Sequence, residues 1–349
     1  MHPRVSAFIF SLAALASLAG AGPAQAAPKL KVALVANQKF GDNGPMDDMA
    51  AGLARAAKEF GVTTKKLEST SAANFEADVR AMAKGGYDLV ITTFPYMSDA
   101  TKLVAKEYPK TKFSAVFQFI NVGGNKVNNI WDTEFHGEAA FYLAGYVAGK
   151  ATKSNKVGIV IGGEEPSPNA EGNAFMRGAK AANPGVSVEF AYVGSYEDPA
   201  KAKEIARAMI GKGVDFIQND SGASNAGVVE AAKAANILTA GEITDFYGTT
   251  KNFVGIVGIG FGDTVYKSVK MLAEAKYPVG EHGIRDLANG GYFMDWKSYD
   301  RFAGENATFG AAVKTGIAEA KALEKKIADG SLRIVFDATV PNWDRIKAE

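Results

Sequence analysis

Residues 128–161, NNIWDTEFHGEAAFYLAGYVAGKATKSNKVGIVI, decide the fold of this chain. They predict a short strand at 128–133, a long helix rich in alanine and glycine at about 137–150, and a buried strand at 156–161. Apolar strands that alternate with amphipathic helices continue on both sides of this stretch. Such alternation favours a parallel sheet with helices on both of its faces. We therefore predict an α/β fold with two doubly wound parallel-sheet lobes joined by a hinge.

The predicted strands fall into two successive series, one before and one after the alanine-rich helix. They are expected at 31–36, 89–93, 112–118 and 128–133, then at 156–161, 186–193, 215–218, 237–240, 253–259, 292–296 and 331–336. No flexible linker separates the two series, which indicates lobes connected by several crossing segments. We expect residues 27–134 with about 260–284 to form the N-terminal lobe, and residues 135–259 with about 285–349 to form the C-terminal lobe.

The composition excludes several classes of function. The 349 residues include 39 Lys and Arg, 38 Asp and Glu, three His and no Cys. A formal charge of +1 argues against a nucleic-acid-binding protein, which usually carries a clear basic excess. Without cysteine the chain has no disulfide, thiolate nucleophile or cysteine-bound metal. Because His2, His136 and His282 are the only histidines, a histidine-rich metal site is not expected either, and neither a metal nor a cofactor is predicted.

Residues 1–26 have the pattern of a secretory signal peptide. Arg4 precedes an apolar run from Val5 to Ala19, and the small-residue sequence Ala24-Gln25-Ala26 ends the segment. The run is about 15 residues long, shorter than the roughly 20 that span a bilayer, so a membrane anchor is the weaker alternative. Cleavage after Ala26 leaves 38 basic and 38 acidic residues. We expect a soluble periplasmic protein without a lipid anchor, since no cysteine is present to carry one.

Polar and aromatic side chains gather in the loops that follow the predicted strands. In open α/β sheets, ligands bind beyond the carboxyl ends of the strands, so these loops supply the candidate ligand-binding residues. They are Phe40, Asp42, Phe94, Tyr96, Gln118, Tyr196, Asn219, Asp220 and Glu242. Aromatic rings offer flat apolar faces, and amides and carboxylates pair with ring N–H and hydroxyl groups. The set suits a flat ligand with polar edges, and its composition does not separate a nucleoside, a base and a sugar.

Two neighbouring features of these loops favour structural roles. Asp47 and Asp48 begin the first predicted helix and are expected to accept hydrogen bonds from its first N–H groups, whereas Asp42 lies deeper in the loop. Gly162 and Gly163 follow a strand, but two glutamates come directly after them and no phosphate-binding glycine motif is present. A nucleotide phosphate site is therefore rejected.

Three segments carry a resemblance to a known family. Residues 129–149, NIWDTEFHGEAAFYLAGYVAG, are similar to a family segment N-V-x-S-x-x-F-x-x-x-E-G-A-F-L-A-G-Y-L-A-G, and this match is the most specific. Residues 194–199, GSYEDP, resemble the family's G-S-F-x-D-P, and residues 215–232 resemble a strand followed by a G-V-x-x-A-A helix. The chain thus resembles the basic membrane protein family of substrate-binding proteins for ABC transporters, which has the type 1 periplasmic-binding fold.

This resemblance implies a protein that captures a small ligand between its lobes and delivers it to a permease in the inner membrane. The family's best-known ligands are purine nucleosides, with purine bases and riboflavin for some members. By position, Asp42 matches an aspartate of the family's first loop, and Tyr196 stands where a base-stacking phenylalanine is expected. Pro45 and Gln118 replace an aromatic residue and an acid, and the family's S-x-x-K pattern is absent. These departures make a free base an alternative to a nucleoside. A monomer that binds no nucleic acid is expected.

Two other classes of function are weaker. An exported hydrolase of nucleosides or sugars could use Asp42 with Asp220 or Glu242 as an acid pair. The sequence contains no G-x-S-x-G motif and no cysteine, however, and His136 is expected to be structural. A sensor that docks on a membrane receptor would share the same fold, and the sequence leaves this alternative open. We therefore predict a binding protein without catalytic activity.

Overall fold

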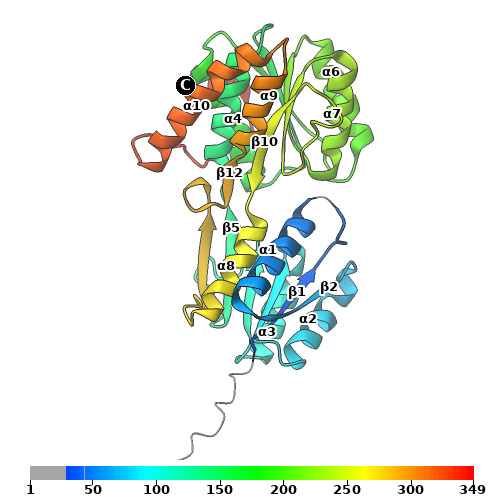
Figure 1. Cartoon of the computed structure of the whole chain (residues 1–349), viewed down its shortest axis with the longest axis vertical. Coiled ribbons are helices and arrows are strands. Elements are labelled where there is room, and N and C mark those ends of the chain that lie inside the picture. The colour runs from blue at the N-terminus through cyan, green and yellow to red at the C-terminus, as the bar shows by residue number, and fades with distance from the viewer. Residues whose placement is uncertain (1–28, 43) are drawn as a thin grey trace, which may run out of the picture.

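The computed structural model describes residues 29–42 and 44–349, which form two α/β lobes stacked along the long axis of the molecule (Figure 1). The predicted signal peptide, residues 1–26, lies outside the described residues. Each lobe contains one six-stranded sheet flanked by helices. The predicted fold class of two lobes built on parallel α/β sheets is therefore confirmed.

The N-terminal lobe has a fully parallel sheet in the strand order β11-β5-β4-β3-β1-β2. Its strands are β1 (Lys31–Ala36), β2 (Thr63–Glu68), β3 (Leu89–Thr93), β4 (Lys112–Val116), β5 (Ile130–Phe135) and β11 (Glu281–Arg285). Its helices are α1 (Pro45–Phe60), α2 (Phe75–Lys84), α3 (Ser98–Glu107) and α8 (Phe261–Ala273). Alternate residues of β1 face opposite cores: Val32 and Leu34 pack in the core shared with α1 and α8, whereas Ala33 and Val35 pack with α2 and α3.

The C-terminal lobe has the strand order β12-β10-β9-β8-β6-β7. Its strands are β6 (Lys156–Ile161), β7 (Ser187–Tyr192), β8 (Phe216–Asp220), β9 (Leu238–Glu242), β10 (Phe253–Ile259) and β12 (Tyr292–Met294). Its helices are α4 (Glu138–Ala151), α5 (Pro166–Ala182), α6 (Pro199–Gly211), α7 (Asn225–Ala235), α9 (Trp296–Glu305), α10 (Gly310–Ala328) and α11 (Trp343–Ala348). The edge strand β12 is antiparallel to β10, whereas the other strand pairs of this sheet are parallel. Strand β12 has this direction because β10 runs toward the N-terminal lobe while β12 returns from it.

The small residues of α4 allow it to pack closely against α5. A Cβ atom added to Gly145 would lie 2.1 Å from the carbonyl oxygen of Phe175, and one added to Gly178 would lie 1.9 Å from that of Tyr142. Ten of the fourteen residues of α4 are buried. Both helices therefore approach at backbone distance, which explains the run of alanine and glycine in the segment that decides the fold.

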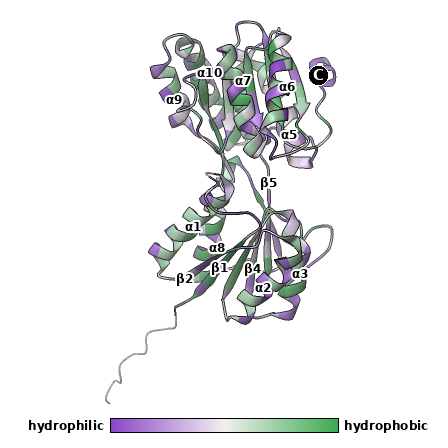
Figure 2. Ribbon diagram, turned by 90° about the vertical axis from the view of Figure 1, so that its right-hand side faces the viewer, coloured by the Kyte–Doolittle hydropathy of each residue, from purple (hydrophilic) through white to green (hydrophobic). Residues whose placement is uncertain are grey.

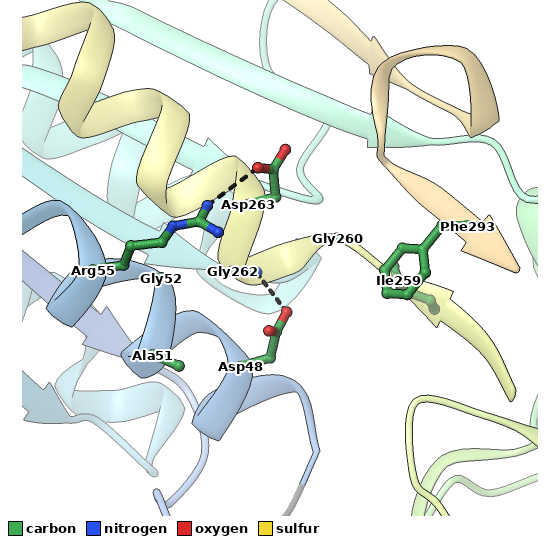
Figure 3. Close-up of a pocket in the computed structure, with 9 residues that line it drawn as sticks. All are labelled: Asp48, Ala51, Gly52, Arg55, Ile259, Gly260, Gly262, Asp263 and Phe293. Carbon is green, nitrogen blue, oxygen red and sulfur yellow. Dashed lines mark hydrogen bonds and ion pairs between the residues drawn. The ribbon is translucent and has the colours of Figure 1, made fainter. Parts of the chain in front are cut away.

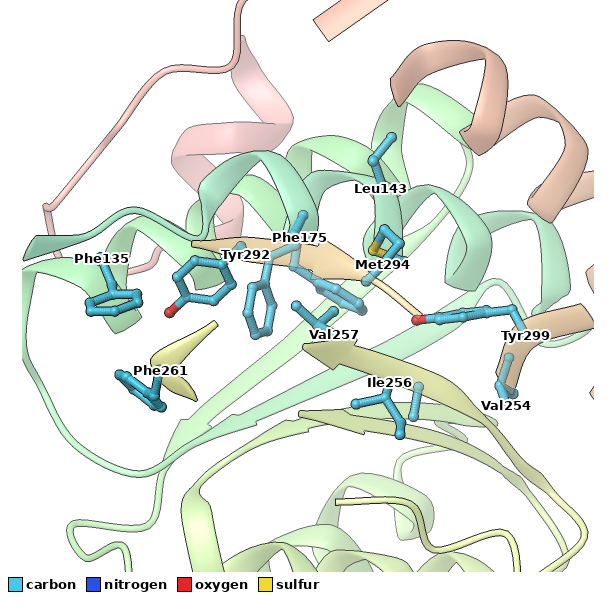
Figure 4. Close-up of a cluster of buried hydrophobic side chains, with 14 of the residues drawn as sticks. Phe135, Leu143, Phe175, Val254, Ile256, Val257, Phe261, Tyr292, Met294 and Tyr299 are labelled. Carbon is cyan, nitrogen blue, oxygen red and sulfur yellow. The ribbon is translucent and has the colours of Figure 1, made fainter. Parts of the chain in front are cut away.

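Three crossovers connect the lobes, between β5 and α4, between β10 and α8, and between β11 and β12. Aromatic rings fix these crossovers to one another (Figure 4). The ring centroids of Phe135 and Phe261 are 4.7 Å apart, and those of Phe135 and Tyr292 are 6.4 Å apart. Each ring belongs to a different crossover, so this cluster forms the centre of the hinge. The predicted lobe boundaries, near residues 134, 260 and 285, stay a prediction.

One predicted strand is wrong and two observed strands were not predicted. Residues 331–336 form no strand; the segment leads to Asp337 and Thr339, whose carbonyl groups accept hydrogen bonds from Asn173 Nδ2 of α5. The chain is therefore held on a helix surface rather than on a sheet edge. Strands β2 and β11 are polar and largely exposed edge strands, so they lack the apolar run that identifies a buried strand.

The hydrophobic residues are concentrated in the strands and the inner faces of the helices (Figure 2). Four short 3-10 helices lie in the loops, at Ala72–Asn74, Pro95–Met97, Gly222–Ser224 and Leu287–Asn289. Within residues 29–42 and 44–349, no helix has the length and apolar character that a membrane crossing requires.

Candidate functional site

The carboxyl ends of both sheets face the space between the lobes. Strands β5 and β10 each end at a crossover into the other lobe, and their parallel neighbours run in the same direction. The loops that follow β1, β3 and β4 therefore oppose the loops that follow β6, β8 and β9. This is the position in which open α/β sheets bind ligands.

Three of these strand ends contain strained backbone. Phe94, Phe117 and Ile243 directly follow β3, β4 and β9 and have φ angles of 60°, 55° and 54°. A residue other than glycine rarely adopts positive φ, and a bulky or β-branched one does so at a cost of about 1–3 kcal/mol. Such strain collects at ligand-binding and catalytic sites. It marks the strand ends as a functional region independently of their residue types.

The strand ends of the N-terminal lobe carry an aromatic cluster. Phe94 packs edge-on against Phe261 at 5.4 Å and against Phe117 at 6.1 Å, and Phe117 contacts Phe119 at 5.9 Å. Tyr96, in the 3-10 helix after Phe94, is 73% exposed, and Phe119 is 42% exposed. Contiguous exposed apolar groups often mark binding sites, and here Phe119 continues the ring contacts of Phe94 and Phe117, while Tyr96 follows Phe94 by two residues. We call these residues, Phe94, Tyr96, Phe117 and Phe119, the aromatic half-site.

Asp42 caps the first helix. Its carboxylate accepts hydrogen bonds from the N–H groups of Gly44, Met46 and Asp47, at 2.9, 3.0 and 3.1 Å. This corrects the expectation that Asp47 and Asp48 do so. Asp48 instead accepts a hydrogen bond from the N–H group of Gly262 at the start of α8, at 2.6 Å. Both carboxylate oxygens of Asp42 are therefore occupied by backbone N–H groups.

The side chains of Gln118 and Phe40 have partners outside the aromatic half-site, although Gln118 stands between Phe117 and Phe119 in the chain. Gln118 is fully buried, and its Nε2 donates to Thr92 Oγ1 at 2.9 Å, inside the core that α2 and α3 cover. Its Oε1 forms no hydrogen bond with any described residue. Phe40 is half-buried beneath Lys66, whose Nζ lies 4.4 Å from the ring centroid. The structure thus places these two predicted residues in local contacts of their own lobe.

The C-terminal lobe carries a cluster of buried carboxyl groups. Asp220 and Glu242, at the ends of β8 and β9, are 5% and 7% exposed, and Glu171 of α5 is 2% exposed. The carboxyl group of Asp220 lies beside those of both glutamates and interacts with them, while its Oδ2 atom forms no hydrogen bond with any described residue. Glu242 Oε1 accepts a hydrogen bond from the N–H group of Gly222 at 3.0 Å. None of the described ion pairs includes these three residues. We call Glu171, Asp220 and Glu242 the carboxyl cluster.

Burial controls the protonation of the carboxyl cluster. It raises the pKa of Asp220 well above its ordinary value, and the nearby carboxyl groups of Glu242 and Glu171 raise it further. Burial also raises the pKa values of Glu171 and Glu242, although hydrogen bonds to them act in the opposite direction. Two carboxyl groups can share a hydrogen bond only when one is protonated. The cluster therefore retains a proton under conditions where an exposed aspartate has lost it.

Tyr196 lies beside the carboxyl cluster. A Cβ atom added to Gly162 would lie 2.2 Å from the Tyr196 ring, so the glycine pair after β6 makes room for this ring. Burial, and then the charges of Asp220 and neighbouring glutamates, raise the pKa of the Tyr196 hydroxyl. Asn219 points to the opposite face of β8, where its Nδ2 donates to Thr239 Oγ1 at 3.3 Å. Of the predicted residues, Tyr196, Asp220 and Glu242 are therefore brought together, and Asn219 is not.

Sequence reasoning missed Glu171, Phe117, Phe119 and Tyr292. Glu171 lies in a helix and Tyr292 in a strand that follows a crossover, so neither belongs to a strand-end loop. Phe119 lies next to Gln118 in such a loop, and the aromatic composition of residues 117–119 was a usable signal. No signal in the sequence identified Glu171, because its position among Asp220, Glu242 and Tyr292 depends on the packing of α5.

One pocket lies between α1, α8 and the edge of the C-terminal sheet (Figure 3), and a second pocket adjoins it between the start of α1 and the same sheet edge. Their volumes are about 300 and 380 Å³, and both are lined by Asp48, Ile259 and Phe293. Burial raises the pKa of Asp48, against the effect of the hydrogen bond from the N–H group of Gly262. None of the nine predicted ligand-binding residues lines either pocket. Within the described part of the chain, no group of three or more His, Asp or Glu side chains is arranged to hold a metal ion.

The fold is that of solute-binding proteins of known structure. An ABC transporter solute-binding protein from Aeropyrum pernix K1 superimposes with a TM-score of 0.73 at 20% identity, covering 91% of this chain and 96% of the other. The family model described as "ABC transporter substrate-binding protein PnrA-like" matches residues 29–306. The chain therefore belongs to this family, Bmp, of ABC transporter substrate-binding proteins, and the resemblance in its sequence is confirmed.

Curated relatives support the same assignment. The "ABC transporter nucleoside-binding protein BmpA" of Lactococcus lactis subsp. cremoris is 29% identical over 286 residues, which is 77% of this chain and 77% of the relative. "Basic membrane protein B" of Borreliella burgdorferi is 25% identical over 270 residues, covering 75% of this chain and 79% of the relative. The family consists of substrate-binding proteins, and one of these two relatives is named for nucleoside binding.

Proposed function

We propose that this protein binds a purine nucleoside or a purine base between its lobes and delivers it to an ABC transporter permease. The observation that carries the proposal is the pair of opposed strand ends. One presents the aromatic half-site, and the other presents Tyr196 with the carboxyl cluster. The name of the relative from Lactococcus lactis supports a nucleoside as the ligand.

The two half-sites match different parts of a purine. Aromatic rings bind the flat face of a base by offset or edge-to-face stacking, and Phe119 and Tyr96 are exposed enough to do so. Carboxylate oxygens accept hydrogen bonds from ring N–H, amino and hydroxyl groups, and Asp220 and Glu242 lie at the strand ends that face the aromatic half-site. Closure of the lobes around the hinge would bring both half-sites onto one ligand.

The proposal also covers the location of the protein and its partner. The signal-like segment at residues 1–26 supports export to the periplasm. Since the family consists of substrate-binding proteins for ABC transporters, the partner is a permease of the inner membrane. This permease would bind the surface that forms when the lobes close. We propose a monomer without catalytic activity, and without a bound metal or cofactor.

Isothermal titration calorimetry with purified protein tests the ligand. We expect adenosine, guanosine, adenine or hypoxanthine to bind with a dissociation constant in the micromolar range or below, whereas glucose and arabinose serve as sugar controls. Riboflavin tests the larger ring system. Binding of a sugar with no response to any purine would contradict the purine assignment, and would leave transport of a sugar as the function. Product released during long incubation with a nucleoside would contradict the absence of catalysis.

A further inference from the structure

Glu171 is a buried acid that lies in a helix and not in a strand-end loop. It lies in the second turn of α5 and accepts a hydrogen bond from the hydroxyl group of Tyr292 at 2.6 Å. Ser167 Oγ lies 3.2 Å from Glu171 Oε1, one helical turn earlier. On its other side, Glu171 lies beside the carboxyl group of Asp220, and the two groups interact. A charged or polar group is buried at this depth only when hydrogen bonds hold it in place.

The partners of Glu171 belong to the crossovers between the lobes. Ser167 Oγ donates to the carbonyl oxygen of Phe135, the last residue of β5, at 2.7 Å. The crossover backbone comes so close that a Cβ atom added to Gly137 would lie 2.4 Å from Glu171 Oε1 and 2.7 Å from the Tyr292 ring. Tyr292 itself begins the strand that follows the third crossover, and it packs against Phe135 (Figure 4). Glu171 thus contacts two of the three crossovers.

We propose that Glu171, together with Tyr292, is a positioning residue that holds the Asp220 carboxyl group in a fixed relation to the crossovers, and thereby couples ligand capture to closure of the lobes. This inference rests on the proposed function, because it takes Asp220 as a ligand-binding group. Glu171 does not contact the ligand in this arrangement. It acts through Asp220 on one side and through Tyr292 and Ser167 on the other.

The groups that face Glu171 determine what its removal should do. Asp220 comes from β8 and Glu242 from β9, and both are acids. Tyr292 comes from β12. The charge of Glu171 also acts on the carboxyl group of Glu138, at the start of α4, and on the hydroxyl group of Tyr196. A neutral side chain at position 171 removes a like charge beside Asp220 and lets Asp220 ionise at lower pH. Loss of the Tyr292 hydroxyl removes a donor that stabilises ionised Glu171, so Glu171 holds its proton to higher pH and its like charge beside Asp220 is weakened, as in Glu171→Gln.

Three variants test the inference. Glu171→Gln keeps the size of the side chain and its ability to accept from Tyr292, while Tyr292→Phe removes only a hydroxyl group. Tyr299→Phe is the matched control, because the Tyr299 hydroxyl is equally buried but forms no hydrogen bond with any described residue. Ligand-free protein, labelled with ¹³C in its Asp and Glu carboxyl groups, is titrated by NMR. In parallel, guanosine binding is measured by calorimetry from pH 5 to pH 8.

We expect the titration midpoint of Asp220 to move to lower pH in Glu171→Gln and, by less, in Tyr292→Phe, and to stay unchanged in Tyr299→Phe. Guanosine donates N–H and O–H groups and binds the ionised carboxylate best, so the pH profile of its affinity should move in the same directions. At pH 6 this corresponds to a change of about threefold to tenfold in the dissociation constant.

Unchanged titration of Asp220 in both variants would overturn the inference, and so would an unchanged pH profile of guanosine binding. If the wild-type protein does not bind guanosine, that result counts against the nucleoside proposed above. The ligand-free titration then decides whether Glu171 holds Asp220. A variant that only loses thermal stability, with the wild-type midpoints retained, would assign Glu171 a purely structural role.

Discussion

At the scale of single residues, the burial of the carboxyl cluster carries a cost in stability. Asp220 is buried beside two other acids and is protonated more readily than in the unfolded chain. A folded-state pKa above the unfolded value means that stability is fully present below the ordinary pKa of aspartate, and is lost as the pH rises through the folded value. Functional groups are often kept at such a cost, because evolution retains sites that are not optimal for stability.

Asp220→Asn should therefore stabilise the ligand-free protein. The amide cannot ionise, and its Nδ2 can donate to Glu171 and Glu242, which now act as acceptors. We expect the free energy of unfolding at pH 8 to rise by about 1–2 kcal/mol, with little change at pH 4. Urea unfolding at both pH values measures this.

The matched control is Asp132→Asn. Asp132 is fully buried, but its carboxylate accepts from the N–H groups of Ile120 and Asn121 and contacts His282 Nδ1 at 2.7 Å. Asp132→Asn should lower the free energy of unfolding, because it replaces a carboxylate oxygen that accepts hydrogen bonds with an amide group that donates them. A loss of stability at position 220 similar to that at position 132 would show that Asp220 is not under strain.

At the scale of helices and strands, local composition decides what can be predicted from sequence. Strands such as β1 and β6 are continuous apolar runs, because both of their faces are buried, and their positions were predicted. Edge strands β2 and β11 have polar residues on exposed faces, so their pairing depends on the neighbouring strand and not on their own pattern. The predicted strand at 331–336 has the right pattern, but the N–H group of Leu332 bonds the carbonyl group of Lys326 at the end of α10, and α5 holds the residues just beyond the segment through Asn173.

The candidate site shows the same division. Asp220, Glu242 and Tyr196 follow strands, and the rule that ligands bind at strand ends finds them. Glu171 belongs to a helix, and only the packing of α5 beneath the crossovers brings it to Asp220. The capping role of Asp42 could not be predicted from the sequence either. Asp42, Asp47 and Asp48 all lie near the N–H groups of the first helical turn, and the sequence does not tell which carboxylate accepts from them.

The contact between α4 and α5 should not tolerate a larger side chain at its glycines. Gly178→Ala would bring a methyl group within 1.9 Å of the Tyr142 carbonyl oxygen, and we expect it to lower the free energy of unfolding by about 1–3 kcal/mol. Gly211→Ala, at the end of α6, is the control, since a Cβ atom there meets no other atom within 4 Å. It should be neutral or stabilising by about 0.5–1 kcal/mol. Equal effects at both positions, measured by urea unfolding, would contradict close packing as the reason for these glycines.

At the scale of the whole molecule, we propose that the two lobes present complementary halves of one site. The aromatic half-site belongs to the N-terminal sheet, whereas Tyr196 and the carboxyl cluster belong to the C-terminal sheet. Neither half encloses a ligand alone. Binding energy gained by bringing both onto one molecule is then available to shift the protein toward the closed form, which is what a transporter needs in order to distinguish loaded from empty protein.

A crystal structure of the protein saturated with guanosine tests this claim most directly. We predict that the purine lies between the lobes, with its ring against the aromatic half-site and its donor groups on Asp220 and Glu242, and that the lobes are closer together than in the ligand-free molecule. Guanosine bound in the pockets beside Asp48 and Phe293, or bound to one lobe without closure, would contradict it.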